Sequence, residues 1–364
     1  MLYIKSLVLK GGISKIVYNF ILRFINLESL VIKENSFELK ESKLPTSLIA
    51  VNVSAYKINF GIVTHCKKLK YLTVNANRYI NSSDIIKLTK LEKLSIGPKS
   101  TDTLRIYNDK TALYEIPLEN TLFLKDLTNL KYLTLNAQRL HKINGIESLQ
   151  NLKQLELCYN QITDIYPITA LASLETLNLS INYISNIDSI RNLKLLKNLD
   201  LSYNHLENIQ GISVLNLNNL NLEGNNISNI DPINNIKSLY QLNLSYNRIN
   251  SINCLSKLKL NSLIIKGNAF SFHEVSFFNN CVQFEIDFND INVKYYNRNK
   301  NYFPIINFHE VIEVDKTVND NILEINDEYY DYDDYSESKD SYCSSCDSSP
   351  CMCSDQENTS NTWW

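Results

Sequence analysis

The sequence predicts an α/β repeat solenoid, a curved array with a parallel sheet on its concave side and extended or 3₁₀-helical segments on its convex side. The main observation is a nine-residue pattern that recurs at intervals of mostly 21 or 22 residues, with apolar residues at every third position between its copies. With 44% hydrophobic and 21% charged residues, the 364-residue chain also has the composition of a folded protein.

The pattern is Leu-x-x-Leu-x-Leu-x-x-Asn, whose positions we number 1 to 9 and whose copies we name by the residue at position 1. Six consecutive copies begin at Leu152, Leu174, Leu196, Leu217, Leu239 and Leu260. The Leu130 repeat before them has Gln138 at position 9. Upstream, the Leu27 and Leu69 repeats are good copies with Asn35 and Asn77 at position 9, whereas the Leu48 and Leu91 repeats have lost the Asn. A copy at Ile4 opens the array, which makes about twelve repeats between residues 4 and 270.

Each part of the pattern has a physical role. Apolar and polar residues alternate at positions 4 to 6, which indicates a short strand with one buried face. The Asn at position 9 is expected to end the strand, because its amide can pair with backbone groups that the turn leaves open. We therefore expect a structural ladder of Asn side chains, formed by Asn160, Asn182, Asn204, Asn225, Asn247 and Asn268. The three-residue spacing that follows favours 3₁₀ or extended segments over full α-helices.

These residues resemble the 22-residue class of leucine-rich repeats, found in regulatory subunits of protein phosphatase 1 and in internalin-type proteins. The resemblance covers roughly residues 4–270. It implies a curved solenoid that binds proteins on its concave sheet. It identifies no partner and no binding residue, because the concave surface is the variable part of that family.

The predicted domains are a solenoid at residues 1–270, a C-terminal cap region at 271–326 and an acidic, cysteine-containing disordered tail at 327–364. The solenoid carries an irregular insertion near residues 100–120, because the Leu91 and Leu130 repeats lie one repeat plus 17 residues apart. We favour a projecting hairpin there. The alternative, a shortened degenerate repeat, would place Pro117 inside a central strand. In the cap region, Phe277, Phe278, Phe284 and Phe288 are candidates to cover the last open core.

Two rows of side chains are candidates for binding a partner on the concave face. Position 5 supplies a polar, slightly acidic row, of which the candidates are Glu156, Asn178, Asp200, Asn221 and Asn243. Position 8 supplies a more aromatic row, Tyr159, Ile181, Tyr203 and Tyr246. Tyrosine provides a large contact area at low entropic cost, which suits a protein interface. The same tyrosines could instead pack beside the Asn ladder as ordinary parts of the turn.

The C-terminal tail offers a second candidate site. Cys343, Cys346, Cys351 and Cys353 are four thiols that could bind a soft metal ion such as zinc. Their neighbours are serines and acidic residues, which favours a disordered segment instead. The preceding acidic, tyrosine-rich stretch suits an interaction motif, a phosphorylation site or simply a solvated tail.

Charge and cysteine usage narrow the possible partners and the compartment. The net charge is −3, and no clustered basic stripe of the kind that binds nucleic acid is present. Neither a secretory signal nor a membrane-spanning run is apparent, and the scattered Cys66, Cys158, Cys254 and Cys281 fit reduced thiols. We therefore expect a cytoplasmic monomer that binds neither nucleic acid nor membrane.

No catalytic pattern is found. The five histidines fall in different repeats without metal-ligand spacing, and the chain has no phosphate-binding loop or nucleophile elbow. We expect no cofactor. The sequence predicts a non-catalytic scaffold that binds a protein partner on its concave face. The alternative is a structural or assembly protein whose cysteine tail binds metal or forms cross-links.

Overall fold

The computed structural model describes residues 4–10, 21, 23–33, 38–39, 44–80, 82–98, 118, 121–270, 281, 283–288 and 291–296. The chain divides into two compact units, Met1–Ile325 and Asn326–Trp364, and every described residue belongs to the first. The predicted tail at 327–364 therefore lies outside the described residues, and its division from the remainder stays a prediction.

The first unit contains a 15-stranded sheet whose strands follow one another mostly in chain order. All neighbouring strands pair in parallel except the last two, β14 and β15. The strands are β1 (Ser6–Lys10), β2 (Ser29–Lys33), β3 (Glu38–Leu39), β4 (Ala50–Asn59), β5 (Tyr71–Ile80), β6 (Lys93–Gly97), β7 (Tyr132–Leu135), β8 (Gln154–Glu156), β9 (Thr176–Asn178), β10 (Asn198–Asp200), β11 (Asn219–Asn221), β12 (Gln241–Asn243), β13 (Ser262–Ile264), β14 (Gln283–Phe288) and β15 (Ile291–Tyr296).

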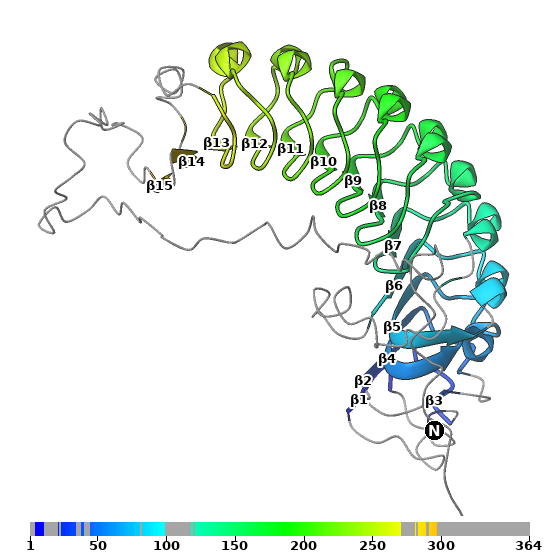
Figure 1. Cartoon of the computed structure of the whole chain (residues 1–364). Coiled ribbons are helices and arrows are strands. Elements are labelled where there is room, and N and C mark those ends of the chain that lie inside the picture. The colour runs from blue at the N-terminus through cyan, green and yellow to red at the C-terminus, as the bar shows by residue number, and fades with distance from the viewer. Residues whose placement is uncertain are drawn as a thin grey trace, which may run out of the picture. The chain divides into compact units, whose positions relative to one another are not determined.

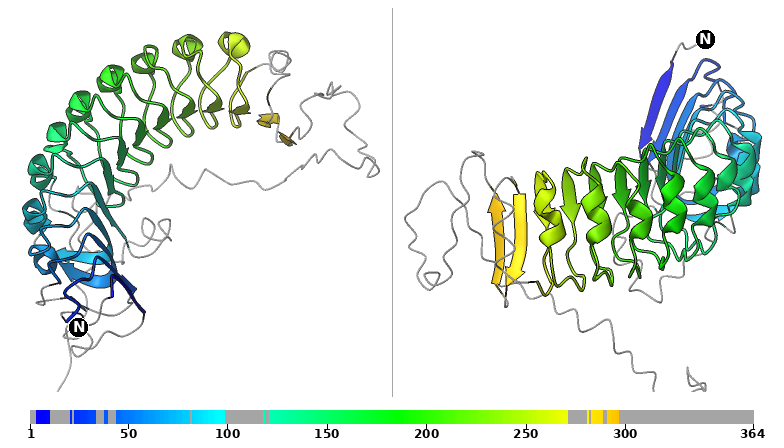
Figure 2. Two further views of the ribbon diagram at one scale, coloured as in Figure 1. Left: turned by 180° about the vertical axis from the view of Figure 1, so that it is seen from behind. Right: turned by 90° about the horizontal axis from the view of Figure 1, so that it is seen from above.

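Short 3₁₀ helices return the chain from one strand to the next. Within this unit, Figures 1 and 2 show the sheet along the inner side of the repeats and these helices along the outer side, which confirms the predicted fold class. The helices are η1 (Phe60–Val63), η2 (Ser82–Lys87), η3 (Leu122–Asp126), η4 (Ile146–Ser148), η5 (Tyr166–Ala170), η6 (Asp188–Asn192), η7 (Gln210–Ile212), η8 (Asp231–Asn235) and η9 (Asn253–Lys257).

The core is one continuous apolar cluster between sheet and helices. In the Leu152 repeat it takes Leu155 and Leu157 from the strand side and Ile162, Ile165 and Ile168 from the return segment, all at most 1% exposed. The same positions are buried in the neighbouring regular repeats. Each repeat thus closes the core of the next, as the three-residue spacing requires.

The Asn side chains at position 9 bind backbone groups of two repeats at once. In Asn204, Oδ1 accepts from the Ile184 N–H at 3.0 Å, and Nδ2 donates to the carbonyl oxygens of Leu179 at 3.0 Å and Leu201 at 3.1 Å. Asn160, Asn182, Asn225, Asn247 and Asn268 make the equivalent contacts. These side chains hold the turn that ends each short strand from β8 to β13.

The N-terminal repeats depart from that geometry. Strands β4 and β5 each span 10 residues, whereas β8 to β13 span three. Asn77 lies inside β5, so the expectation that an Asn at position 9 ends the strand is wrong for this repeat. In the regular repeats, the Asn side chain accepts from a backbone N–H of the preceding repeat, as Asn204 does from Ile184. The equivalent residue for Asn77 is Ile58, which is paired with β5 in the sheet instead.

The inserted residues lie within a single repeat. Strand β6 pairs directly with β7, Leu94 opposite Leu133, which leaves no place in the sheet for a strand of an intervening repeat. Leu118 and Thr121 are 4% and 1% exposed and precede η3 at the spacing that core positions keep in regular repeats. The 17 extra residues therefore fall between β6 and Leu118, and the alternative of a degenerate repeat with its own central strand is wrong. Most of the segment proposed as a hairpin lies outside the described residues.

The parallel sheet continues past residue 270. Strand β14 pairs with β13 in register, Leu263 opposite Phe284 and Ser262 opposite Gln283. Cys281, which is 4% exposed, stands where Leu260 stands one repeat earlier. An eroded repeat thus begins inside the predicted cap region, and β15 ends the sheet by pairing with β14 in antiparallel fashion. Phe277 and Phe278 lie outside the described residues.

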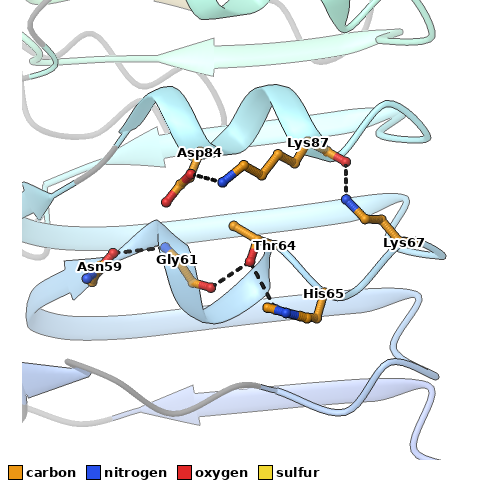
Figure 3. A network of polar contacts seen from close by, with 7 residues as sticks. All are labelled: Asn59, Gly61, Thr64, His65, Lys67, Asp84 and Lys87. Atoms are coloured by element: carbon orange, nitrogen blue, oxygen red, sulfur yellow. Dashed lines mark hydrogen bonds and ion pairs between the residues drawn. The ribbon is translucent and has the colours of Figure 1, made fainter.

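A polar network joins the outer sides of two N-terminal repeats (Figure 3). Asn59 caps η1, because its Oδ1 accepts from the Gly61 N–H at 2.9 Å, and the Thr64 hydroxyl donates to the Gly61 carbonyl oxygen at 2.9 Å. The Lys67 ammonium donates to the Lys87 carbonyl oxygen at 3.1 Å, and Lys87 pairs with Asp84. These contacts cap η1 and link neighbouring repeats, so the network has a structural role.

Candidate functional site

The candidate site is an open groove on the inner face of the sheet across β8 to β14, which we call the central groove. It is about 440 Å³ in volume. Its lining comes from the strands alone, at Glu156, Thr176, Leu177, Asn178, Asn198, Leu199, Asp200, Asn219, Leu220, Asn221, Gln241, Leu242, Asn243, Ser262, Ile264 and Gln283. Because the strands are parallel and in register, equivalent positions of successive repeats form straight rows across it.

The position 5 candidates all lie in this groove. Glu156, Asn178, Asp200, Asn221 and Asn243 occupy consecutive strands and line it together. Four of them also shape the chain locally, since Oδ1 accepts from the backbone N–H two residues further on. For Asp200 that donor is Ser202 at 2.9 Å, and for Asn178 it is Ser180 at 2.9 Å. The preference for Asn and Asp at position 5 therefore arises in part from this hydrogen bond to the backbone, which stabilises the fold.

A second row, at position 3, was missed by the sequence analysis. Asn219 donates from Nδ2 to Oδ1 of Asn198 at 2.6 Å, and Asn198 donates to the Thr176 hydroxyl at 3.2 Å. These bonds join side chains 21 or 22 residues apart into a polar row along the groove. Strand alternation was the signal that could have found it, because positions 3 and 5 flank the buried Leu at position 4.

Position 3 also carries two exposed tyrosines on the same sheet face, before the central groove. Tyr71 on β5 and Tyr132 on β7 are 43% and 41% exposed, with Lys93 of β6 paired between them. They too were missed as candidates. Exposed tyrosines on a sheet face are suited to contact a protein partner.

The position 8 row lies at the edge where the strands end, outside the groove lining. Tyr159, Ile181, Tyr203 and Tyr246 all have φ between 53° and 58°, in the left-handed region. The Tyr203 ring lies against Gly224, where an added Cβ would come within 2.6 Å of Cδ1. Tyr246 contacts Gly267 in the same way.

These tyrosines therefore combine packing with exposure. The Tyr203 hydroxyl donates to Oε1 of Glu223 at 2.7 Å, while 36% of the residue remains exposed. At position 10 of neighbouring repeats, Tyr183 and His205 stack with ring centroids 5.7 Å apart. The structure thus separates the two predicted rows, placing position 5 in the groove and position 8 at its edge.

The two charged residues that line the central groove, Glu156 and Asp200, are both acidic. At positions 3, 5 and 7 of the five repeats that carry β8 to β12, the charged residues are Glu156, Asp200 and Glu223, and none is Lys or Arg. Burial, and after it the negative charges of Glu156 and Asp200, raise the pKa of the Cys158 thiol to about 12. That thiol stays protonated at neutral pH and is a poor nucleophile.

No group of three or more His, Cys, Asp or Glu side chains able to hold a metal ion occurs among the described residues. Cys66, Cys158, Cys254 and Cys281 are free thiols. The candidate metal ligands Cys343, Cys346, Cys351 and Cys353 lie outside the described residues, so that site stays a prediction. In the described part of the chain, no helix is long and apolar enough to cross a membrane.

Comparisons with known proteins agree with this architecture. A family model described as leucine-rich repeats in two copies matches residues 150–192. No curated protein matches the chain significantly.

Several solved structures share the fold. The internalin InlF of Listeria monocytogenes is 22% identical, with 78% of this chain and 87% of that chain covered and a TM-score of 0.59. The functional domain of InlJ from the same organism is 16% identical, with 74% and 66% covered and a TM-score of 0.52. The plant peptide hormone receptor RGFR1, solved in complex with RGF2, is 20% identical, with 70% and 43% covered and a TM-score of 0.52.

Proposed function

This chain is a leucine-rich-repeat protein, and from that premise we propose that it is a non-catalytic scaffold that binds a protein partner on its concave sheet. The observation that carries the proposal is the central groove, an open sheet face lined mostly by polar side chains of consecutive strands. The similar receptor RGFR1, solved in complex with RGF2, supports a binding role by analogy.

The chemistry of the site also favours binding over catalysis. The groove side chains are mostly amides and hydroxyls that bond to one another across strands, such as Asn219 to Asn198. Such a surface offers rigid hydrogen-bonding groups, and the exposed Tyr132 lies beside it on β7, a combination that suits an interface. We place the protein in the cytoplasm as a monomer, a proposal supported by the free thiols Cys66 and Cys281.

Affinity capture with the immobilised full chain tests the proposal. The variant Thr176→Trp with Gln241→Trp fills the groove without changing its charge, and Asn192→Trp with Gln210→Trp adds the same bulk on η6 and η7. We expect the wild-type chain and the η6–η7 variant to retain one partner from extracts of the source cells, and the groove variant to lose it. Equal capture by all three would contradict the proposal, and recovery of the chain itself alone would indicate self-assembly instead.

The edge row has its own test within the same experiment. Replacing Tyr159, Tyr203 and Tyr246 together by Ala removes the aromatic surface at position 8 while leaving the groove lining in place. Unchanged capture by this variant would exclude the edge row from the interface and leave the groove as the contact surface.

A further inference from the structure

We propose that the segment held in the central groove is cationic, an extended stretch of a partner protein rich in Lys or Arg that crosses the strands from β8 to β12. The inference rests on the proposed function and specifies the chemistry of its partner. It follows from where charges lie in these repeats and from how the carboxylates are held.

Charge is segregated between the two sides of the repeats. Over residues 121–270, cations outnumber anions by 13 to 10. The groove lining nonetheless holds Glu156 and Asp200 and no Lys or Arg, and Glu223 borders it, bonded to the lining residue Asn243. The cations that form ion pairs in these repeats do so elsewhere, as Lys153 with Glu175 at 2.8 Å and Arg191 with Asp188 at 2.7 Å.

Within the described part of the chain, these three carboxylates accept hydrogen bonds from neutral groups alone. Glu156 accepts from the Thr134 hydroxyl at 3.2 Å, and Asp200 accepts from the Ser202 hydroxyl at 2.7 Å. Glu223 accepts from the Tyr203 hydroxyl at 2.7 Å and from the Asn243 amide at 2.8 Å. Neutral donors fix the orientation of each carboxylate but do not neutralise its charge. A cationic ligand would therefore find these side chains already ordered, and its binding would cost little side-chain entropy.

The fold itself does not require these charges. Asn178 and Asn243 make the same turn hydrogen bond as Asp200 with a neutral amide. At position 7, where Glu223 stands, the other repeats from Leu152 to Leu239 have Cys or Ser. At position 5 the charge of Asp200 therefore adds repulsion without adding a turn bond that Asn would lack.

The spacing suits an extended chain. Glu156 and Asp200 stand on strands separated by one other, β9, which places their backbones about 10 Å apart for strands about 4.8 Å apart. A polyproline-type chain advances about 9 Å over three residues and returns to the same face. Basic residues at every third position of such a segment would meet successive carboxylates.

The test uses the full chain and a synthetic peptide of Lys-Pro-Ser repeats that carries a photoreactive group, with adducts located by mass spectrometry. We expect adducts in the repeats of β8 to β12 that diminish as NaCl is raised, since exposed charges are screened within about 10 Å at 0.1 M salt. The same peptide with Glu in place of Lys should give none there. Locating the adducts separates binding in the groove from binding to the acidic residues 327–364.

Two variants with equal loss of negative charge complete the experiment. The first, which we call the neutral-groove variant, carries Glu156→Gln, Asp200→Asn and Glu223→Gln. It should raise the peptide concentration for half-maximal groove adducts about tenfold. The second carries Asp126→Asn, Glu207→Gln and Asp231→Asn, at exposed positions outside the groove. It should leave this peptide concentration unchanged.

Equal effects of the two variants, or adducts confined to residues 327–364, would overturn the inference. If the natural partner is lost by the Thr176→Trp, Gln241→Trp variant yet retained by the neutral-groove variant, the proposed function stands and its partner is not cationic. If both of these variants retain the partner, the proposed function and the inference are both wrong.

Discussion

At the scale of single residues, the Asn at position 9 does more than end a strand. Each side chain from Asn160 to Asn268 satisfies backbone groups of its own repeat and of the one before it. Gln138 holds this place in the Leu130 repeat, and its Oε1 is buried without a hydrogen bond to any described residue. Gln138 keeps the donation to the carbonyl oxygen two residues back, that of Asn136 at 3.0 Å, but its Oε1 does not replace the acceptor oxygen of Asn.

Substitution of Asn204 tests the ladder. Asn204→Ala leaves the Ile184 N–H and the carbonyl oxygens of Leu179 and Leu201 without this partner. Because unpaired buried polar groups are costly, we expect the free energy of unfolding to fall by about 3 kcal/mol, measured by urea denaturation. Asn192→Ala, at an exposed position of η6, is the control and should change stability by less than about 0.5 kcal/mol. Similar losses in both variants would show that the ladder is not a major source of stability.

At position 8, Tyr203 and Tyr246 depend on the residue at the same position of the next repeat. These residues are Gly224 and Gly267, whose missing Cβ leaves room for the ring. Neither the tyrosine nor the glycine alone would suggest this pairing, because they are 21 residues apart in the chain.

At the scale of elements, the Leu91 repeat is complete but interrupted. Its strand β6 and its outer helix η3 are both present, and the inserted residues separate them. Long insertions at the surface cost little because loop-closure entropy grows slowly with length. The insertion should therefore be removable.

Deletion of residues 101–117 tests this interpretation. It joins Ser100 to Leu118 and restores a spacing of 22 residues between the Leu91 and Leu130 repeats. We expect cooperative urea unfolding with a change in stability of no more than about 1 kcal/mol. Deletion of residues 121–127 is the control, because it removes the buried Thr121, Leu124 and Leu127 and should abolish cooperative unfolding. Loss of folding in the first deletion would mean that the insertion is part of the core.

At the scale of the whole molecule, the buried thiols Cys66 and Cys281 and the partly buried Cys158 make its stability depend on pH. Burial raises the pKa of Cys66, Cys158 and Cys281 from the usual value near 9 to about 12. In the unfolded chain these thiols ionise as the pH passes about 9, whereas in the folded protein they stay protonated. The stability they contribute is therefore complete below pH 9 and is lost as the pH rises toward 12.

We expect the urea midpoint to decrease from pH 8.5 to pH 10.5, with at most about 1.4 kcal/mol lost per pH unit for each thiol. Lysine and tyrosine ionise in the same range, so the comparison is with a variant that carries Cys66→Ala, Cys158→Ala and Cys281→Ala. That variant should be less stable at pH 8.5 and should lose less of its remaining stability by pH 10.5. Identical slopes for the two proteins would show that the thiols do not control the alkaline transition.

The sequence by itself determined the repeat, the parallel sheet and the 3₁₀ outer side, because Leu155, Leu177 and their equivalents recur at a spacing that only stacked strands can bury. Tertiary structure decided which side chains share a surface. It aligned Thr176, Asn198 and Asn219 into a row, moved the position 8 tyrosines to the edge, kept Asn77 inside a strand and extended the sheet to β14. The physical reason is that these contacts join neighbouring strands, and register and backbone conformation bring together residues that lie a full repeat apart in the chain.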